Sequence, residues 1–223
     1  MGISEKIREI RAELPAGVKL VAVSKTKPNE DIMMAYNAGQ KIFGENKVQD
    51  LVQKQATLPT DIEWHFIGHL QTNKVKYIAP FVDLIHAVDS LKLLTLIDKE
   101  AIKADRVITC LLQFHIAEEE TKFGLDLDEA IDLLTADEYK KLENVKIAGV
   151  MGMATYTDDL AQVRREFASL KTIFDKLKIQ FFSKEVDFKE ISMGMSDDYQ
   201  IAVEEGSTMV RIGSTIFGER NYF

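Results

Sequence analysis

Short apolar runs that alternate with helical patterns along the whole chain restrict its fold more than any other feature. Most of these runs are β-branched or continuously apolar, as is typical of strands that are covered on both faces. The runs are residues 19–26, 40–45, 63–69, 83–89, 106–114, 146–154, 190–195 and 209–217. Eight strands alternating with helices in 223 residues predict an α/β fold, a single-domain (β/α)8 TIM-type barrel over residues 1–223. An open doubly wound sheet is the alternative.

The helical signals agree with this alternation. Pro28 and Gly39 flank one helical pattern, Ser90 can cap another, and apolar residues at steps of three and four predict a long helix over 159–178. Only "GERNYF" follows the last strand run, so we expect no eighth helix there. An extra N-terminal helix is predicted to cover that gap with one apolar face, formed by Ile3, Ile7, Ile10 and Leu14.

Charge and composition exclude several classes of function. The net charge of −8 argues against a nucleic-acid or anionic-membrane partner, because both need clustered basic surface. The single cysteine, Cys110, lies in the apolar run "VITCLL", cannot form an internal disulfide, and fits a reducing compartment. The sequence has no signal-peptide pattern and no membrane-spanning segment, so we expect a cytoplasmic protein.

One lysine stands out in the first strand run, "KLVAVSKT". Alternation puts Val21, Val23 and Lys25 on one face, and ligands of such barrels bind where the strands reach their C-terminal ends. Burial disfavours the charged form of a lysine, and a neutral amine can condense with an aldehyde to form a Schiff base. The plainer alternative is that the Lys25 amine reaches solvent at the rim or pairs with a carboxylate.

The last two strand runs are followed by groups that bind phosphate. The "GST" segment, which consists of Gly213, Ser214 and Thr215, supplies backbone amides and two hydroxyls. Ser196 lies at the expected N-terminus of a helix, where free amides attract anions. Each feature alone is also an ordinary turn or helix cap. Together with Lys25 across the mouth they indicate an aldehyde that carries a phosphate, and pyridoxal phosphate is the obvious candidate.

Three further residues are candidates for contacts with the ring of such a ligand. Arg211, flanked by apolar residues in "MVRIGS", can face a pyridine nitrogen or pair with an acidic neighbour. Asn46 can donate to a ring oxygen or cap a helix, and Met193 can pack on the ring or in the core. His65 and His69 are expected on one face of a strand, but no metal-binding motif accompanies them.

Several stretches of the chain resemble the pyridoxal phosphate homeostasis proteins, a family of single-domain barrels. They are "AVSKTKP" (22–28), "FGENKVQ" (43–49), "WHFIGHLQTNKVK" (64–76), "AVDS" (87–90), "GVMGMAT" (149–155) and "ISMGMSDDYQIAVEEGSTMVRIGSTIFGER" (191–220). The resemblance implies that Lys25 carries the cofactor as a Schiff base. It also implies that the phosphate is held by Ser196, Gly213, Ser214 and Thr215, with Arg211 facing the ring nitrogen and Asn46 nearby. The stretch "FHIAEEETKFG" (114–124) departs from the family, because His115 replaces an asparagine.

The family's barrel is similar to the N-terminal domain of alanine racemase. A racemase needs a second base, a tyrosine from a separate C-terminal domain, and we expect no such domain in these 223 residues. The resemblance therefore implies a protein that buffers or delivers pyridoxal 5′-phosphate inside the cell, with no dedicated reaction. A pyridoxal phosphate-dependent racemase or lyase acting on a small amino acid is the alternative, and an aldolase that uses Lys25 without this cofactor is a second. We expect a monomer that meets apo-enzymes only transiently.

Overall fold

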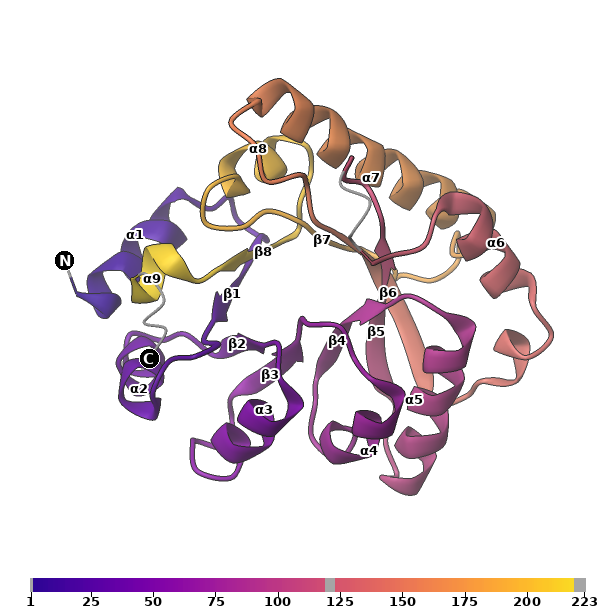
Figure 1. Ribbon diagram of the computed structural model, residues 1–223, viewed down its shortest axis with the longest axis horizontal. Helices are drawn as coiled ribbons and strands as arrows, with labels where there is room; N and C mark the ends of the chain where they lie inside the picture. Colours follow the sequence, from indigo (N-terminus) through magenta and orange to yellow (C-terminus); the bar gives the residue numbers. More distant parts are fainter. Residues whose placement is uncertain (1, 119–122, 219–223) are drawn as a thin grey trace.

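The computed structural model describes residues 2–118 and 123–218. Its eight strands are parallel and close into a barrel in the order β1 to β8, with β1 paired to β8. The helices surround this ring of strands (Figure 1). The prediction of a TIM-type (β/α)8 barrel is therefore confirmed. The alternative of an open doubly wound sheet is wrong, because the ring closes and leaves no edge strand.

Every predicted strand run coincides with one strand to within a few residues, and most strands end before the run does. They are β1 (Lys19–Val23), β2 (Ile42–Glu45), β3 (Glu63–Phe66), β4 (Leu84–Val88), β5 (Ile108–Phe114), β6 (Val145–Gly152), β7 (Glu190–Ser192) and β8 (Met209–Ile212). In β1, β3 and β7 the remaining residues of the run form loops at the C-terminal mouth of the barrel, and after β8 they lead into α9. Most of the candidate ligand residues therefore lie in loops that are held by short, rigid strands.

Helices precede the first strand, separate the strands as predicted, and also follow the last strand. They are α1 (Ile3–Glu13), α2 (Asn29–Asn37), α3 (Val48–Gln55), α4 (Val75–Ile78), α5 (Leu91–Lys103), α6 (Leu127–Thr135), α7 (Leu160–Gln180), α8 (Tyr199–Glu204) and α9 (Ser214–Phe217), with 3-10 turns η1 (Thr72–Lys74) and η2 (Tyr139–Lys141). The predicted cap of α5 is confirmed, because Ser90 Oγ accepts a hydrogen bond from the Leu93 amide at 3.3 Å. Within the described residues, no helix has the length and apolar character needed to cross a membrane.

Apolar side chains fill both faces of the strands. One core lies between the barrel and its helices, and Cys110 is fully buried in it. A smaller core fills the barrel interior, and its buried members are Val21, Leu84, Ala87, Leu111, Ala148, Met151 and Met209. Burial on both faces explains why the strand runs are continuously apolar rather than alternating.

The N-terminal helix packs where the barrel closes. α1 buries Ile7 and Ile10 and contacts both α2 and α9, which lie beside it in Figure 1. This arrangement agrees with the predicted covering role of the N-terminal helix. The expectation that no helix follows the last strand is wrong. β8 ends at Ile212, earlier than predicted, so Ser214–Phe217 are available for the one-turn helix α9.

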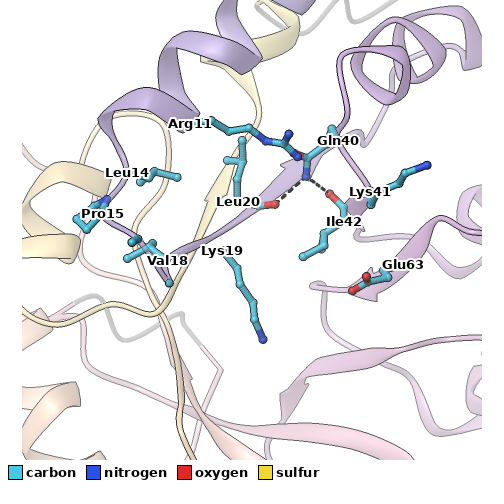
Figure 2. A pocket seen from close by; sticks show the side chains of 12 residues that line it. Arg11, Leu14, Pro15, Val18, Lys19, Leu20, Gln40, Lys41, Ile42 and Glu63 are labelled. Carbon is cyan, nitrogen blue, oxygen red and sulfur yellow. Dashed lines mark hydrogen bonds between the residues drawn. The ribbon is translucent and has the colours of Figure 1, made fainter.

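Arg11 and Gln40 connect α1 to the N-terminal end of the barrel (Figure 2). The buried amide of Gln40 donates to the carbonyl oxygens of Leu20 at 2.7 Å and Ile42 at 2.6 Å, and so bridges β1 and β2. Arg11 Nη2 donates to Gln40 Oε1 at 3.0 Å and to the Gly39 carbonyl at 2.9 Å. One side chain therefore satisfies polar groups on two strands and one helix.

We expect Gln40→Ala to lower the free energy of unfolding by about 2 kcal/mol, because it leaves buried carbonyl groups without a donor. Urea denaturation followed by circular dichroism measures the change. Lys41→Ala is the matched control, since the Lys41 ion pair with Asp61 lies on the surface and contributes little. Equal losses for the two variants would contradict a bridging role for Gln40.

Candidate cofactor-binding site

The loops at the C-terminal ends of the strands surround a cavity of about 430 Å³, which we call the ligand cavity. Its polar lining includes the predicted residues Lys25, Asn46, Ser196, Arg211, Gly213 and Ser214. These residues come from the ends of β1, β2, β7 and β8, and only the closed barrel brings them together. The position agrees with the usual ligand site of this fold.

Lys25 lies just beyond β1, in a tight turn. The Lys27 amide donates to the Ser24 carbonyl at 3.0 Å, and Thr26 has a φ of 65°, in the left-handed region. This turn follows Val23 directly, so the half-buried Lys25 side chain enters the cavity from the wall of the barrel. The next lysine in the turn is held differently, because Lys27 Nζ donates to the Phe217 carbonyl at 2.9 Å and the Gly218 carbonyl at 3.2 Å.

A buried ion pair supports the turn from the side of α3. Glu45 Oε1 accepts from Ser24 Oγ at 2.6 Å and from Lys54 Nζ at 2.7 Å, and Lys54 Nζ also donates to the Ser24 carbonyl at 2.8 Å. Burial raises the pKa of Glu45, while the charge and the hydrogen bond of Lys54 act in the opposite direction. The backbone immediately before Lys25 is therefore fixed by three polar contacts.

Ser196 and the segment that starts α9 form the opposite wall. Ser196 Oγ accepts from the backbone amide of Gly213 at 3.2 Å and of Thr215 at 3.5 Å. Two amides thus point at one oxygen position, where a phosphate oxygen could also bind. A side chain at residue 213 would crowd β1, because its Cβ would lie 3.2 Å from the Val23 carbonyl oxygen. Glycine therefore allows this close approach.

The structure corrects the expected role of Ser196 as a helix cap. Ser196 was expected to cap the helix that follows β7, but α8 starts at Tyr199 and its N-cap residue is Asp198. The amides that converge on Ser196 belong instead to Gly213 and Thr215, at the start of α9. Ser196 stays a phosphate-binding candidate through contacts across the β7 and β8 loops, which local sequence does not reveal.

Arg211 brings a buried positive charge to the floor of the ligand cavity. Its side chain is 4% exposed, and it donates from Nη1 to Ser192 Oγ at 2.6 Å and from Nη2 to the Gly152 carbonyl at 3.1 Å. Burial lowers the pKa of Arg211 to about 10, so the guanidinium stays protonated at neutral pH. Within the part of the chain that the structure describes, these two bonds use two of its five N–H groups, and the others can donate to a ligand.

The remaining predicted residues differ in whether their side chains line the cavity. Asn46 is half-buried and lines the cavity, whereas Thr215 contributes its backbone amide. Met193 is fully buried in the core outside the barrel and does not line the cavity. Its neighbour Met195 lines the cavity instead, because the chain turns after β7 and strand alternation no longer applies.

The expectation that His65 and His69 face the same side of a strand is wrong. β3 ends at Phe66, so His65 points into the barrel and His69 lies in the loop that lines the ligand cavity. The ring of His69 stacks on Phe123 with centroids 4.4 Å apart, and its Nδ1 lies 3.5 Å from Asp89 Oδ2. No cluster of three metal-ligating side chains occurs among residues 2–118 and 123–218.

Several residues that line the cavity were not predicted from the sequence. Lys27, Gln113, Phe123 and Met195 line it, and Gln113 Nε2 donates to the Phe123 carbonyl at 2.9 Å. Gln113 lies on β5 within an apolar run, so a polar residue near the C-terminal end of a predicted strand was a usable signal. No such signal in the sequence points to Phe123, since it belongs to a loop whose position depends on the whole barrel.

The chain is similar to proteins of one family along almost its whole length. The family model described as the N-terminal domain of alanine racemase matches residues 2–221. A pyridoxal phosphate homeostasis protein of Aquifex aeolicus is 43% identical over 206 residues, which cover 92% of this chain and 88% of the relative. The human protein of the same name is 37% identical over 235 residues and covers 99% of this chain and 85% of its own length.

Solved structures agree with these matches. PipY of Synechococcus elongatus, solved without pyridoxal phosphate, superposes with a TM-score of 0.90 at 37% identity, covering 97% of this chain and 100% of PipY. The structure of PipY with pyridoxal phosphate bound has a TM-score of 0.86 at 36% identity, with the same coverage. Alanine racemase from E. faecalis, at 13% identity and a TM-score of 0.70 over 97% of this chain and 57% of the racemase, shares the fold.

Proposed function

The chain belongs to the family of pyridoxal phosphate homeostasis proteins, built on the alanine racemase N-terminal domain, and from this membership we propose that it binds pyridoxal 5′-phosphate and buffers or delivers this cofactor in the cell. The observation that carries the proposal is the lining of one cavity by a lysine amine, a buried guanidinium and the amides that converge on Ser196. We treat residues 1–223 as one cofactor-binding barrel domain.

The donor groups of the cavity fit the chemistry of this cofactor. When it is bound, pyridoxal phosphate supplies two groups: an aldehyde, which reacts with primary amines, and an aromatic ring conjugated to that aldehyde. Lys25 would hold the cofactor through its amine, because a primary amine can condense with an aldehyde and release water. Ser196, Ser214 and the amides of Gly213 and Thr215 bind the phosphate.

Arg211 and Asn46 complete the proposed set. Arg211 would face the ring nitrogen, and because its guanidinium keeps its protons, it would leave that nitrogen largely unprotonated. An unprotonated ring is a weak acceptor of electrons, which limits carbanion chemistry. Asn46 lines the same cavity and donates toward a ring oxygen. Met193, although predicted to touch the cofactor, supports the site from the core.

A carrier role fits the site better than a dedicated enzyme. The tyrosine that could serve as a second base, Tyr156, lines the cavity but is 87% exposed. A catalyst needs a site from which water is excluded, whereas a carrier must release its ligand. A weak racemase or lyase activity on a small amino acid is the second candidate, and Tyr156 is the observation in its favour.

We further propose a cytoplasmic monomer that meets apo-enzymes only transiently. The closed barrel leaves no strand edge for pairing with another copy, which supports the monomer. Analytical ultracentrifugation of the purified protein tests the oligomeric state.

Titration with pyridoxal 5′-phosphate, followed by absorbance, tests the proposed function. We expect a visible absorption band, and after borohydride reduction and proteolysis we expect the label on the peptide that contains Lys25. Pyridoxal without the phosphate should bind at least about tenfold more weakly, because it lacks the charged group that the amides bind. Absence of binding, or a label on another lysine, would overturn the assignment. Efficient turnover of any member of an amino-acid panel would decide against the carrier role.

A further inference from the structure

A line of buried polar side chains crosses the barrel beneath the ligand cavity. Arg211 Nη1 donates to Ser192 Oγ at 2.6 Å, and Ser192 Oγ lies 2.9 Å from His86 Nδ1. On the other side of the same ring, His86 Nε2 lies 3.0 Å from His65 Nδ1. All four side chains are 4% exposed or less. They come from β8, β7, β4 and β3, so the bond between His86 and Ser192 spans the barrel interior.

The two ends of this hydrogen-bonded chain of side chains lie at opposite mouths of the barrel. Arg211 lines the ligand cavity at the C-terminal mouth. His65 lines a second cavity of about 240 Å³, which we call the basal cavity, formed by the first residues of the strands. The strand register between β4 and β5 shifts between Ile85 and Val88, around His86. Such an irregularity turns a side chain away from the regular alternation.

The donor and acceptor roles along the chain give it one direction. Arg211 can only donate, so Ser192 Oγ accepts from it and keeps its own proton for another acceptor. Within the described residues, that acceptor is His86 Nδ1. His86 must then carry its proton on Nε2 and donate to His65 Nδ1, which places the His65 proton on Nε2 toward the basal cavity.

The surroundings keep both histidines neutral, as this direction requires. Burial lowers the pKa of His65 to about 3, with a smaller effect of the nearby Lys19 charge. Burial also lowers the pKa of His86 well below its usual value, and His65 and Arg211 act in the same direction. Three of the four carboxylates that line the basal cavity are engaged with other groups. Glu190 pairs with Lys19 at 2.5 Å, Asp187 pairs with Lys146, and Asp83 accepts from the Trp64 amide at 2.7 Å. The fourth, Glu63, lies on β3 with His65.

We propose that Ser192, His86 and His65 are positioning residues: they form a hydrogen-bonded chain of fixed polarity through the barrel that holds the Arg211 guanidinium at the floor of the ligand cavity. The polarity is a property of the cofactor-free protein. The effect on ligand binding rests on the proposed function, because it concerns how Arg211 is presented to a pyridoxal phosphate ring.

The polarity is tested by NMR of the cofactor-free protein with ¹⁵N-labelled histidine. We expect His65 and His86 both as neutral rings with the proton on Nε2, unchanged between pH 7 and about pH 5. In Ser192→Ala the His86 Nδ1 loses its donor, so the ¹⁵N shifts of both histidines should change. In Leu111→Val, a substitution in the barrel interior outside the chain, they should not. A proton on Nδ1 of either ring overturns the proposal.

The positioning role is tested by pyridoxal 5′-phosphate titration of three variants. We expect Ser192→Ala and His86→Leu to weaken binding by about tenfold and to shift the absorption maximum. His86→Asn keeps an acceptor for the Ser192 hydroxyl and should restore most of the affinity. Leu111→Val should bind as the parent protein does. Equal binding by the Leu and Asn variants, or unchanged binding by Ser192→Ala, contradicts the role.

These experiments separate the inference from the function on which it rests. If the parent protein does not bind pyridoxal phosphate, the proposed function fails while the NMR result still decides the polarity of the chain. If the parent protein binds and the variants bind equally well, the function stands and the positioning role is wrong. Should His86→Leu not fold, the affinity of Ser192→Ala and the ¹⁵N shifts still distinguish these outcomes.

Discussion

Lys25→Ala is expected to abolish the covalently bound cofactor. The variant should show neither the visible absorption band nor a borohydride-stable label. The reason is chemical, because a C=N bond to the aldehyde requires a primary amine at the position of Lys25, and alanine supplies none there. Absorbance and intact mass after reduction measure the loss directly. No other substitution in the site has an expected effect of this size.

The neighbouring lysine provides the matched control. Lys27 lines the same cavity, but its Nζ donates to the Phe217 and Gly218 carbonyls at the end of α9. Lys27→Ala should therefore keep the label on Lys25, with at most a modest loss of affinity. A Lys25→Ala protein that still carries a stoichiometric reducible label on Lys27 would contradict the assignment.

The protein groups that are proposed to bind the phosphate should act independently of the Lys25 amine. In Lys25→Ala the amides of Gly213 and Thr215 still converge on Ser196 Oγ, so the variant keeps its anion-binding groups. Pyridoxal phosphate that binds to it should be removed by dialysis. Under the proposed function, the covalent bond and the phosphate contacts would contribute to retention at opposite walls of one cavity.

The sequence predicted the barrel because its signals are local and repeated. Most strand runs are apolar on both faces, and most are followed by a helical pattern with recognisable ends, such as Ser90 before α5. The ends of the strands were predicted less well. β8 stops at Ile212, and the predicted run extended to residue 217 because "STIF" is as apolar as a strand.

The candidate site was predicted where it follows strand ends and missed where it depends on loops. Lys25 and Arg211 were found because a charge in an apolar run is unusual, and Ser196 because it follows a strand. Met193 was predicted to contact the ligand, whereas Met195 lines the cavity. The reason is that strand alternation stops at Ser192, so the chain beyond it buries Met193 and directs Met195 to the cavity. Their placement depends on a turn that no periodicity describes.

The chain from His65 to Arg211 could not be predicted from the sequence. Its members lie on four strands that are far apart in sequence, and the bond between His86 and Ser192 joins residues 106 positions apart. Apolar flanks suggest buried residues but not their partners. The contact requires that the barrel close with β4 opposite β7, and that the irregular register of β4 turn His86 inward.

The same two histidines predict acid sensitivity of the fold. Their pKa values are lowered in the folded protein, to about 3 for His65, whereas in the unfolded chain a histidine binds its proton near 6.5. Below pH 6.5 the unfolded state therefore binds more protons, so stability is present above that pH and is lost as the pH falls. Each histidine contributes about 1.4 kcal/mol per pH unit in this window.

We expect His65 and His86 together to lower the free energy of unfolding by about 4 kcal/mol between pH 7 and pH 5. Burial raises the pKa of Glu45 and of Asp83, and these groups oppose the loss as the pH falls toward 5. Urea denaturation at several pH values measures the net slope. The contribution of one histidine is isolated by the difference between the slopes of the parent protein and a variant.

His65→Gln should reduce that slope by about 1.4 kcal/mol per pH unit, even though it destabilises the protein at neutral pH. The slope is the informative quantity, because a purely structural defect would lower stability equally at every pH. Leu111→Val is the control, since it alters packing in the barrel interior without removing a titratable group and should leave the slope unchanged. If His65→Gln gave the same slope as the parent protein and as Leu111→Val, His65 would titrate alike in the folded and unfolded states. The barrel interior would then not hold His65 neutral, and the direction of the hydrogen-bonded chain to Arg211 would lose its physical basis.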